Sequence, residues 1–314
     1  MRVFLTGATG FVMGAVARRL RERGDEVVAL VRTPSRATAL TAIGCELVAG
    51  DVVDPSGAMS ELARCDALIH GAGIYEIGVS AERRRAMEET NVTGTRRILG
   101  AAQAARTKRV VYVSTIAAFG NTRGAIVSEG HRPTEAPTSA YEDTKRRAHE
   151  VTLEAARGGA PIVIVQPGQV YGPGDHSAVG ANFRALAEGR LRYRAFEDLG
   201  LNLVHVDDLA DGIVRALDRG RPGESYVLGG EIATLGDAYG AVALATGRKL
   251  PRLVVPAGIA RLMRFVPSMR EVVSSADGVT FWASDAKARA ELGTTPRGLR
   301  QGMRDTFGPR AGGG

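Results

Sequence analysis

The stretch SAYEDTKRRAHE, residues 139–150, holds a tyrosine and a lysine that could act together on a proton. Tyr141 and Lys145 are four residues apart, so in a helix their side chains lie on one face and can interact. A phenol is a weak acid with a pKa of about 10, and a nearby ammonium group favours the phenolate and lowers that pKa. The same spacing also occurs on ordinary surface helices. Other parts of the sequence must therefore decide whether Tyr141 and Lys145 form a catalytic pair or only part of a surface helix.

A glycine-rich segment near the N-terminus predicts a site for a dinucleotide. Residues 4–20, FLTGATGFVMGAVARRL, have the pattern of a short apolar strand, a glycine loop and the start of an amphipathic helix. Gly7 and Gly10 can adopt backbone angles that other residues avoid, and they let amide groups approach a pyrophosphate at the positive helix end. Met13 replaces the third glycine of the usual pattern, and Gly14 follows one residue late. Because that glycine serves helix–strand packing, the change concerns packing more than the cofactor.

The end of the second predicted strand favours NADP(H) over NAD(H). Enzymes that bind NAD usually have an acidic residue there, which binds the ribose hydroxyls. This strand instead ends in ALVRTPSR, with Arg32 and Arg36. A guanidinium matches a 2′-phosphate in charge and in hydrogen-bonding geometry. The alternative is that Arg32 only faces solvent.

Alternating strand-like and helix-like segments must position these residues. The runs RVFLT, EVVALV, CELVAGD, DALIHGAG, KRVVYVST and APIVIVQPG are almost continuous in Val, Ile and Leu, as strands buried on both faces are. Helix-like segments separate them, including a long one over about 81–106. Repeated strand–helix units form parallel sheets. We therefore expect a doubly wound α/β fold of the Rossmann type, with ligands at the C-terminal ends of the strands.

The regular alternation ends after residue 167. Gly-rich segments follow, with a strand–helix unit in LVHVDDLADGIVRALDRG, a strand in ESYVLGG and a proline-bounded helix in PAGIARLMRFVP. We predict an NADP(H)-binding Rossmann domain over 1–167, a smaller mixed α/β substrate-binding region over 168–307 that interleaves with the sheet, and a disordered tail over 308–314.

Composition limits the classes of protein. With 44% hydrophobic and 24% charged residues, the sequence is typical of soluble globular proteins. The net charge of +7 raises the question of nucleic acid, but the basic residues are spread over several helix-like segments and accompany no nucleic-acid-binding motif, so we expect no such partner. Cys45 and Cys65 have no C-x-x-C spacing, and no apolar run reaches membrane-spanning length. We expect a cytoplasmic protein with free thiols and no membrane partner.

The histidines do not predict a metal site, because the spacing of His70, His176 and His205 fits no metal-binding pattern. His205 is better explained as an anchor of a strand–helix junction beside Asp207, which we expect to cap the helix. His176 follows YGPGD in a loop on the predicted substrate side. The candidate substrate contacts are Tyr75, His176 and Tyr193; Tyr75, Tyr193 and Phe183 could line the pocket or belong to the core.

From residue 1 to about 307 the sequence resembles the extended short-chain dehydrogenase/reductase family, in its epimerase/dehydratase and dihydroflavonol-reductase-like branch. The segments TGATGF, GDVVD, HGAG, NVTGT, VYVSTIAAFG, YEDTK, QPGQVYGPGD, HVDDLA and SDAKARAELG occur in the family's order. The region DLGLNLVHVDDLADGIVRALDRGRPGESYVLGGE is also similar to bacterial hopanoid-associated sugar epimerase-like proteins. Each segment alone is modest evidence, and their common order and spacing carry the resemblance.

The resemblance implies roles for individual residues. Tyr141 and Lys145 match the family's catalytic tyrosine and lysine, and Thr115 matches its hydroxyl partner, with Ser114 as the alternative. Asn91 matches an asparagine that supports the active-site helix and the proton path. The candidate cofactor contacts are Gly7, Thr9, Gly10, Phe11, Arg32, Arg36, Asp51, Val52, Ala72, Gly73, Ser114, Tyr141, Lys145, Pro167 and Val170.

Three positions depart from the family's pattern, and Met13 is the first. Thr115 stands where a serine is commoner, which keeps the hydroxyl but adds a methyl group and restricts the first side-chain torsion. Gln166 stands where the family often has an arginine before Pro-Gly, so the local anchoring is in doubt.

Together these inferences predict an NADP(H)-dependent oxidoreductase that reduces a carbonyl group of a small molecule. While a hydride reaches the carbonyl carbon, Tyr141 would give a proton to the oxygen and Thr115 would stabilise it. Lys145 would lower the pKa of Tyr141 and hold the nicotinamide ribose. The alternatives are a nucleotide-sugar epimerase or dehydratase of the same family and a non-catalytic NADP(H)-binding regulator. The resemblance also implies a homodimer through the helices over 81–106 and 141–157.

Overall fold

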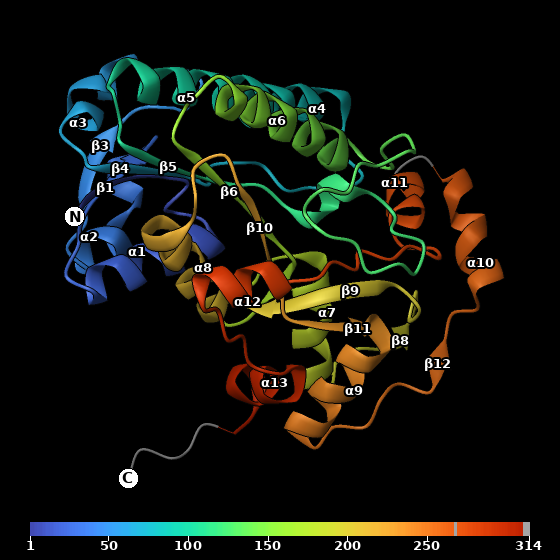
Figure 1. The fold of residues 1–314 in the computed structure, drawn as a ribbon. Helices are drawn as coiled ribbons and strands as arrows, with labels where there is room; N and C mark the ends of the chain where they lie inside the picture. The colour runs from blue at the N-terminus through green and yellow to red at the C-terminus, as the bar shows by residue number, and fades with distance from the viewer. Residues whose placement is uncertain (267–268, 310–314) are drawn as a thin grey trace, which may run out of the picture.

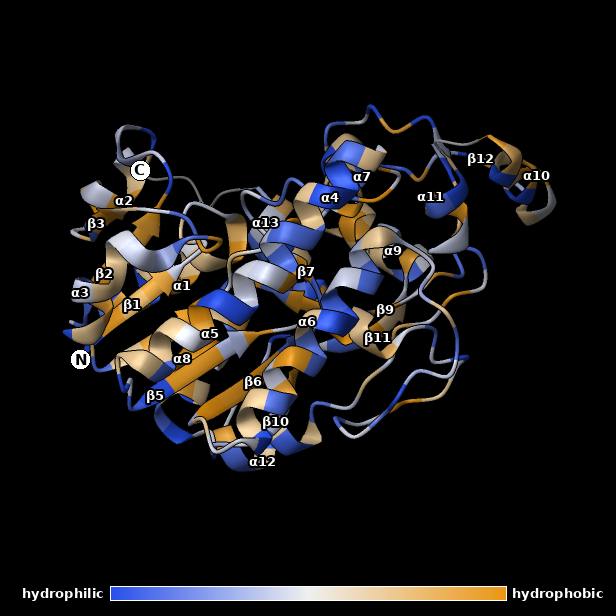
Figure 2. Cartoon of the chain, turned by 90° about the horizontal axis from the view of Figure 1, so that it is seen from above, coloured by the Kyte–Doolittle hydropathy of each residue, from blue (hydrophilic) through white to orange (hydrophobic). Residues whose placement is uncertain are grey.

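A parallel sheet of seven strands forms the centre of the computed structural model, which describes residues 1–266 and 269–309 (Figure 1). The strand order is β10-β6-β5-β4-β1-β2-β3. The strands are β1 (Arg2–Thr6), β2 (Glu26–Val31), β3 (Glu46–Ala49), β4 (Ala67–His70), β5 (Arg109–Val113), β6 (Ile162–Pro167) and β10 (Ser225–Leu228). Figure 2 shows that these strands are strongly hydrophobic, as strands covered on both faces must be.

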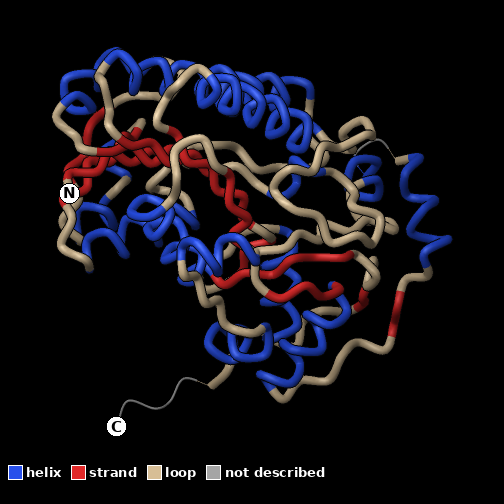
Figure 3. The backbone as a smooth tube through the Cα atoms, in the orientation of Figure 1, coloured by secondary structure: helices blue, strands red, loops and turns tan. Residues whose placement is uncertain are grey.

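Helices cover both faces of this sheet, as Figure 3 shows. One layer contains α1 (Phe11–Glu22), α2 (Thr38–Ala42), α8 (Val206–Arg219) and α12 (Ala286–Leu292), and the other contains α3 (Met59–Ala63), α4 (Ala81–Glu88), α5 (Thr95–Ala104) and α6 (Ala140–Arg157). Side chains along β1 alternate between the layers, because Val3 and Leu5 pack into the first core whereas Phe4 packs into the second. The predicted doubly wound α/β fold is confirmed.

A smaller part lies beyond the C-terminal ends of the strands. It contains a sheet of order β11-β9-β7, a two-stranded sheet of β12 and β8, and a separate core. Its strands are β7 (Gln169–Tyr171), β8 (Tyr193–Arg194), β9 (Gly200–His205), β11 (Glu231–Thr234) and β12 (Leu253–Val254). Its helices are α7 (Ala178–Ala187), α9 (Leu235–Thr246), α10 (Ala257–Leu262), α11 (Arg270–Ser274) and α13 (Leu299–Phe307). Because β10, α8 and α12 join the large sheet, the chain after residue 167 contributes to both parts.

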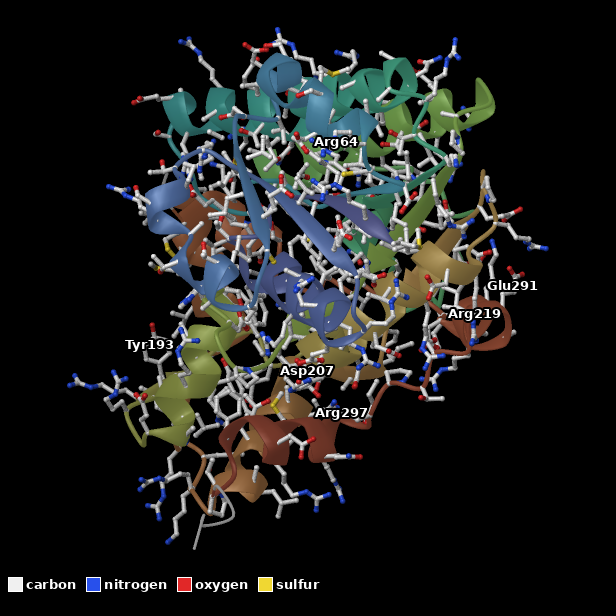
Figure 4. All side chains as sticks on the ribbon, turned by 90° about the vertical axis from the view of Figure 1, so that its left-hand side faces the viewer. Arg64, Tyr193, Asp207, Arg219, Glu291 and Arg297 are labelled. Carbon is white, nitrogen blue, oxygen red and sulfur yellow. The ribbon has the colours of Figure 1, made fainter. Side chains whose placement is uncertain are left out.

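An arginine links the two parts. The Arg297 guanidinium binds the carboxylate of Asp208 in the first turn of α8, with Nη2–Oδ1 and Nε–Oδ2 distances of 2.8 and 2.9 Å. It also binds Asp305 on α13, with an Nη1–Oδ2 distance of 2.8 Å. Figure 4 shows Arg297 close to Asp207, which lies in the same turn of α8. The paired charges fix α13 against the large domain.

Two local predictions differ from the structure. The helix predicted over 81–106 is interrupted, because α4 and α5 are separated by a π-helical turn, η3 (Glu89–Gly94). The residue that caps α8 is His205 rather than Asp207, since the His205 Nδ1 accepts a hydrogen bond from the Asp207 amide at 3.2 Å.

The proline-bounded helix is α10, which continues as a short 3₁₀ turn, η5 (Met263–Phe265). The remaining 3₁₀ turns are η1 (Pro34–Arg36), η2 (Pro55–Ala58) and η4 (Ile116–Phe119).

The thiols, the possibility of a membrane-spanning helix and the tail were also addressed from the sequence. Cys45 and Cys65 are buried free thiols. Within residues 1–266 and 269–309, no helix has the length and apolarity needed to cross a membrane, and no cluster of side chains could hold a metal ion. Most of the tail predicted to be disordered, residues 310–314, lies outside the described residues.

Candidate active site

A cavity of about 1750 Å³ extends from the C-terminal ends of the central strands into the smaller part of the molecule. Its large-domain end is lined by the glycine loop after β1 and by the ends of β2, β4 and β5. Its other end is lined by α7, α10 and the residues around β8. The predicted site residues that line it are Gly7, Thr9, Gly10, Phe11, Arg32, Asp51, Val52, Ala72, Gly73, Tyr75, Ser114, Thr115, Tyr141, Lys145, Pro167, Val170, His176 and Tyr193.

The glycine loop fits a pyrophosphate. Gly7 has a φ of +79°, and a Cβ atom there would lie 2.8 Å from backbone atoms of Ala72, so both conformation and space require glycine. Gly10 begins α1 with a φ of −85°, so the expectation that it uses a backbone angle other residues avoid is wrong. Among the described residues no side chain caps α1 at Gly10, which leaves the amides of the first turn available to an anion.

Met13 is accommodated by a glycine on the neighbouring strand end. Its side chain is only 3% exposed and packs against Gly71, where an added Cβ atom would lie 2.2 Å from the Met13 sulfur. Gly14 packs against the loop, because a Cβ atom there would lie 3.3 Å from the carbonyl oxygen of Ala8. The missing third glycine is therefore compensated by Gly71, and the helix still packs closely on the sheet.

The two candidate arginines lie in different places. Arg32 follows β2 directly, is exposed and lines the cavity. Arg36 ends the turn η1, is also exposed and lies outside the cavity lining of the described residues. Asp51 and Val52 line the cavity beside Arg32, and the Asp51 Oδ1 accepts a hydrogen bond from the Val53 amide at 3.1 Å. Three of the predicted adenosine-side residues, Arg32, Asp51 and Val52, thus line the same end of the cavity.

Thr115, Tyr141 and Lys145 come together on one wall. Thr115 follows β5 and begins the turn η4, where its Oγ1 accepts a hydrogen bond from the Ala117 amide at 3.1 Å. Tyr141 and Lys145 lie in the first two turns of α6, which begins at Ser139 because the Ser139 Oγ accepts a hydrogen bond from the Glu142 amide. Thr115 is 9% and Lys145 is 8% exposed, so both polar side chains lie in a largely dry environment.

Burial controls the acidities of this set. It raises the pKa of Tyr141 above its ordinary value, the nearby Tyr75 raises it further, and a hydrogen bond with the Thr115 side chain opposes the shift. Burial also lowers the pKa of Lys145 to about 8. The Lys145 Nζ donates to the Val113 carbonyl oxygen at 3.0 Å and lies 3.5 Å from the Tyr112 hydroxyl. Burial therefore raises the pKa of Tyr141, and the lowering by Lys145 that the sequence predicts is not found in this geometry.

Asn91 lies outside the cavity lining of the described residues and joins two segments of the site by hydrogen bonds. It is 2% exposed in η3, and its Oδ1 accepts a hydrogen bond from the Ile74 amide at 2.7 Å. Its Nδ2 donates to the Ile74 carbonyl oxygen at 3.0 Å and to the Thr144 Oγ1 at 3.1 Å. Asn91 thus ties the loop after β4 to the residue before Lys145, which makes it a positioning residue.

A buried hydrogen-bonded chain behind Asn91 was not predicted from the sequence. Thr95 donates to the Asn91 carbonyl oxygen at 2.7 Å, so its Oγ1 accepts from the His70 Nε2 at 3.0 Å. The His70 Nδ1 then accepts from the Thr6 hydroxyl at 2.7 Å. Burial lowers the pKa of His70 to about 3, so the ring is neutral. The only signal in the sequence was a polar residue at the end of each of two buried strands, which the register places side by side as Thr6 and His70.

The substrate side of the cavity contains the three predicted contacts. The Tyr75 ring meets the Tyr141 ring edge to face, with centroids 4.6 Å apart. His176 and Tyr193 line the cavity and are exposed, whereas Phe183 is fully buried in the core of the smaller part. Phe183 therefore belongs to the core.

Two polar positions near the cavity have unusual environments. Asp175 lines the cavity and is 3% exposed; its Oδ1 accepts from the Ser177 amide at 2.8 Å, and its Oδ2 has no partner within residues 1–266 and 269–309. Gln166 is fully buried, and neither polar atom of its amide has a partner in the same set of residues. Asp175 was not predicted as a site residue, although it ends the segment YGPGD directly before His176. The unpaired amide of Gln166 is consistent with weaker anchoring of the chain at the position where the family often has an arginine.

Comparisons with known proteins identify the relatives of this chain. Residues 3–229 match the NAD dependent epimerase/dehydratase family. A Synechocystis protein named as a dihydroflavonol 4-reductase is 33% identical over 96% of this chain and 92% of its own length. Sterol demethylase protein B of Methylococcus capsulatus is 32% identical over 97% of each chain. The crystal structure of gox2253 is 32% identical, with a TM-score of 0.85 over 97% of this chain and 96% of its own.

Other relatives are named for two kinds of activity, reduction of a carbonyl compound and conversion of a nucleotide sugar. Some are named as reductases or ketoreductases, and others as a UDP-glucose 4-epimerase or a dTDP-glucose 4,6-dehydratase. The solved epimerase structures that are 20–22% identical to this chain show the shared fold alone. The match over residues 3–229, together with relatives at 32–33% identity over almost the whole chain, places this protein in the NAD-dependent epimerase/dehydratase family of extended short-chain dehydrogenases/reductases.

Proposed function

We propose that this protein is an NADP(H)-dependent reductase that acts on a carbonyl group of a small apolar molecule. The observation that carries the proposal is the meeting of Thr115, Tyr141 and Lys145 on one wall of a cavity that also contains the glycine loop. A binding protein without chemistry needs the loop but has no use for a proton donor placed against the ligand. The set therefore favours an enzyme over a non-catalytic regulator.

The cofactor would be held by groups at the large-domain end of the cavity. Gly7 and the first-turn amides of α1 would bind the pyrophosphate, and Asp51 and Val52 would contact the adenosine. Lys145 would hold the nicotinamide ribose, and Arg32 would pair with a 2′-phosphate. When bound, NADPH supplies a hydride to the carbonyl carbon.

The chain's own residues manage the proton and the developing charge. The Thr115 hydroxyl donates a hydrogen bond to the substrate oxygen and stabilises the negative charge that grows there. The Tyr141 hydroxyl transfers its proton to that oxygen. Lys145, whose pKa is lowered to about 8, provides positive charge that stabilises the phenolate left on Tyr141. Asn91 keeps α6 and the loop after β4 in register during these steps.

The substrate end of the cavity favours reduction of an apolar carbonyl compound over epimerisation of a nucleotide sugar. Among the side chains that line this end are Leu191, Phe196, Leu199, Leu201, Val272 and Phe281. Two of the arginines that line the cavity, Arg83 and Arg190, are paired with Glu76 and Glu188, whereas Arg192 has no ion-pair partner among the described residues. The preference therefore rests on the apolar lining, against which apolar rings or chains would bury well.

A turnover assay with a substrate panel tests the proposal. The protein is incubated with NADPH or NADH and with aromatic ketones, alicyclic ketones, long-chain ketones, UDP-sugars and dTDP-sugars, and cofactor oxidation and sugar products are followed. We expect NADPH oxidation with at least one apolar ketone and no conversion of the sugar nucleotides. Conversion of a sugar nucleotide would establish the epimerase or dehydratase alternative. Tight NADPH binding without turnover on any class would favour the regulator.

A further inference from the structure

Exposed apolar side chains are concentrated in one segment, residues 253–266, which comprises β12, α10 and η5. Of the twelve large hydrophobic side chains that are exposed among the described residues, seven lie in this segment. They are Leu253, Val254, Ile259, Leu262, Met263, Phe265 and Val266, with exposed fractions from 40% to 77%. Single exposed apolar side chains are normal on proteins, but a contiguous group of this kind marks a contact surface.

The same part of the chain is strongly basic. Residues 248–266 contain five cations and no aspartate or glutamate. The cations are Arg248, Lys249, Arg252, Arg261 and Arg264. Asp277, which lies outside this stretch, accepts a hydrogen bond from Arg261 at 2.7 Å and lies 3.7 Å from Arg264. The positive charge is therefore only partly neutralised by neighbours, and it lies just before and within the segment that holds the exposed apolar side chains.

The segment also forms the mouth of the substrate cavity. Ile259 and Met263 line the cavity and are 57% and 42% exposed, so they face the cavity and the outside at once. Tyr193 of β8 lies beside the segment, because β8 pairs with β12; Tyr193 also lines the cavity, and its side chain is 55% exposed. Figure 2 shows β12 and α10 at the periphery of the molecule, away from the large sheet, and Figure 4 shows Tyr193 at its edge.

We propose that segment 253–266 docks on an anionic lipid surface. Its apolar side chains enter the boundary between headgroups and acyl chains, and its arginines contact lipid phosphates. A short amphipathic element with a basic surround lies on a membrane without crossing it, so the absence of a spanning helix among the described residues agrees with this mode. The proposal departs from the expectation, drawn from the sequence, of no membrane partner.

Charge decides between a lipid surface and a second copy of the chain. In a two-fold interface the same patch lies on both sides, so its cations, of which Arg261 and Arg264 share Asp277, would approach their own copies. Like charges brought together at an interface oppose association, whereas an anionic bilayer complements them. Docking also places the mouth between Tyr193 and Met263 against the bilayer, where an apolar substrate would be concentrated; this last step alone rests on the proposed function.

Vesicle sedimentation of the full-length protein tests the docking. Vesicles of phosphatidylcholine, with and without phosphatidylglycerol, are mixed with the protein at low and at high salt. We expect binding to the anionic vesicles at low salt, weaker binding at high salt because charges are screened, and little binding to neutral vesicles. Phe265→Ser should lower the partition coefficient by about tenfold, and Arg252→Glu by about fivefold or more.

Two matched control variants change the same residue types elsewhere. Leu244→Ser alters a leucine of α9 that is 68% exposed, and Arg18→Glu alters an exposed arginine of α1, so neither should affect vesicle binding. Thermal unfolding and NADPH titration of each variant report whether it is folded. The proposal is overturned if folded wild-type protein stays in the supernatant at low salt, or if Phe265→Ser binds vesicles as wild type does. It is also overturned if Phe265→Ser instead converts an oligomer to a monomer. Because sedimentation needs no substrate, its outcome is independent of whether the reductase activity is found.

Discussion

Replacing Tyr141 by phenylalanine removes a single hydroxyl from the candidate site. The ring that remains keeps the edge-to-face contact with Tyr75, whose centroid lies 4.6 Å away. The start of α6 is unaffected, because it depends on the Ser139 side chain and the Glu142 amide. We therefore expect Tyr141→Phe to fold normally and to bind NADPH nearly as well as the wild type.

The size of the loss in turnover depends on which other groups could give the proton. Lys145, with a pKa near 8, is a stronger acid than Tyr141, whose pKa burial raises. The Lys145 Nζ is, however, held by the Val113 carbonyl oxygen at 3.0 Å, which directs it toward β5. The Thr115 hydroxyl is far too weak an acid to replace a phenol. We therefore expect the full loss of a general acid, roughly 10²–10⁴ in kcat, or about 2.7–5.5 kcal/mol.

The assay follows NADPH oxidation with a substrate identified by the panel and reports kcat and KM separately. Tyr226→Phe is the matched control, because it removes the same hydroxyl from a ring that bonds Glu291 outside the cavity lining of the described residues, and its kcat should change little. Lys145→Met should lose both kcat and cofactor affinity, since Lys145 is assigned to the phenolate and to the ribose. If Tyr141→Phe kept most of its turnover while Lys145→Met lost it, Lys145 would be the acid and the assignment would be wrong.

Three further predictions concern the cofactor and the assembly. Arg32→Asp should weaken NADPH binding by at least about tenfold, or about 1.4 kcal/mol, in calorimetric titrations, and equal or tighter binding of NADH by the wild type would contradict the preference. Because the pKa of Lys145 is near 8 and its charged form would bind the ribose, NADPH affinity should fall as pH rises through 8 in the wild type but stay level in Lys145→Met, and parallel profiles would exclude that contact. Light scattering should give the mass of a two-fold dimer formed through the layer of α4, α5 and α6; a clean monomer mass would refute it.

Much of the fold could be predicted because burial on both faces leaves a direct trace in the sequence. The runs that became β1, β2, β5 and β6 are almost continuous in Val, Ile and Leu, so their strand character does not depend on distant partners. The amphipathic pattern that predicted α1 and α8 is similarly local. The interruption at η3 was not predictable in this way, because it brings Asn91 against Ile74 and Thr144, which are distant in sequence.

The candidate site shows the same division between local and distant causes. The spacing of Tyr141 and Lys145 gives their helix face, and the glycine loop is recognisable from the consecutive residues TGATGF. Met13 raised a doubt that the sequence could not resolve, because the compensating Gly71 lies at the end of another strand. His70 was considered only as a metal ligand, since its partners Thr6 and Thr95 are brought to it by strand register and by the turn η3.

The direction of the Tyr141 pKa is the point at which sequence reasoning fails for a physical reason. A lysine four residues away implies a lower pKa, and the sequence contains no information on solvent access. In the folded chain the burial of the two side chains penalises their charged forms, raising the pKa of Tyr141 and lowering that of Lys145. A phenol that stays protonated and an amine that titrates near 8 together suit reduction, because the proton must remain on Tyr141 until negative charge develops on the substrate oxygen. In the proposed mechanism the protonated Lys145 would stabilise the phenolate at the moment it forms, so its effect would belong to the reaction more than to the resting site.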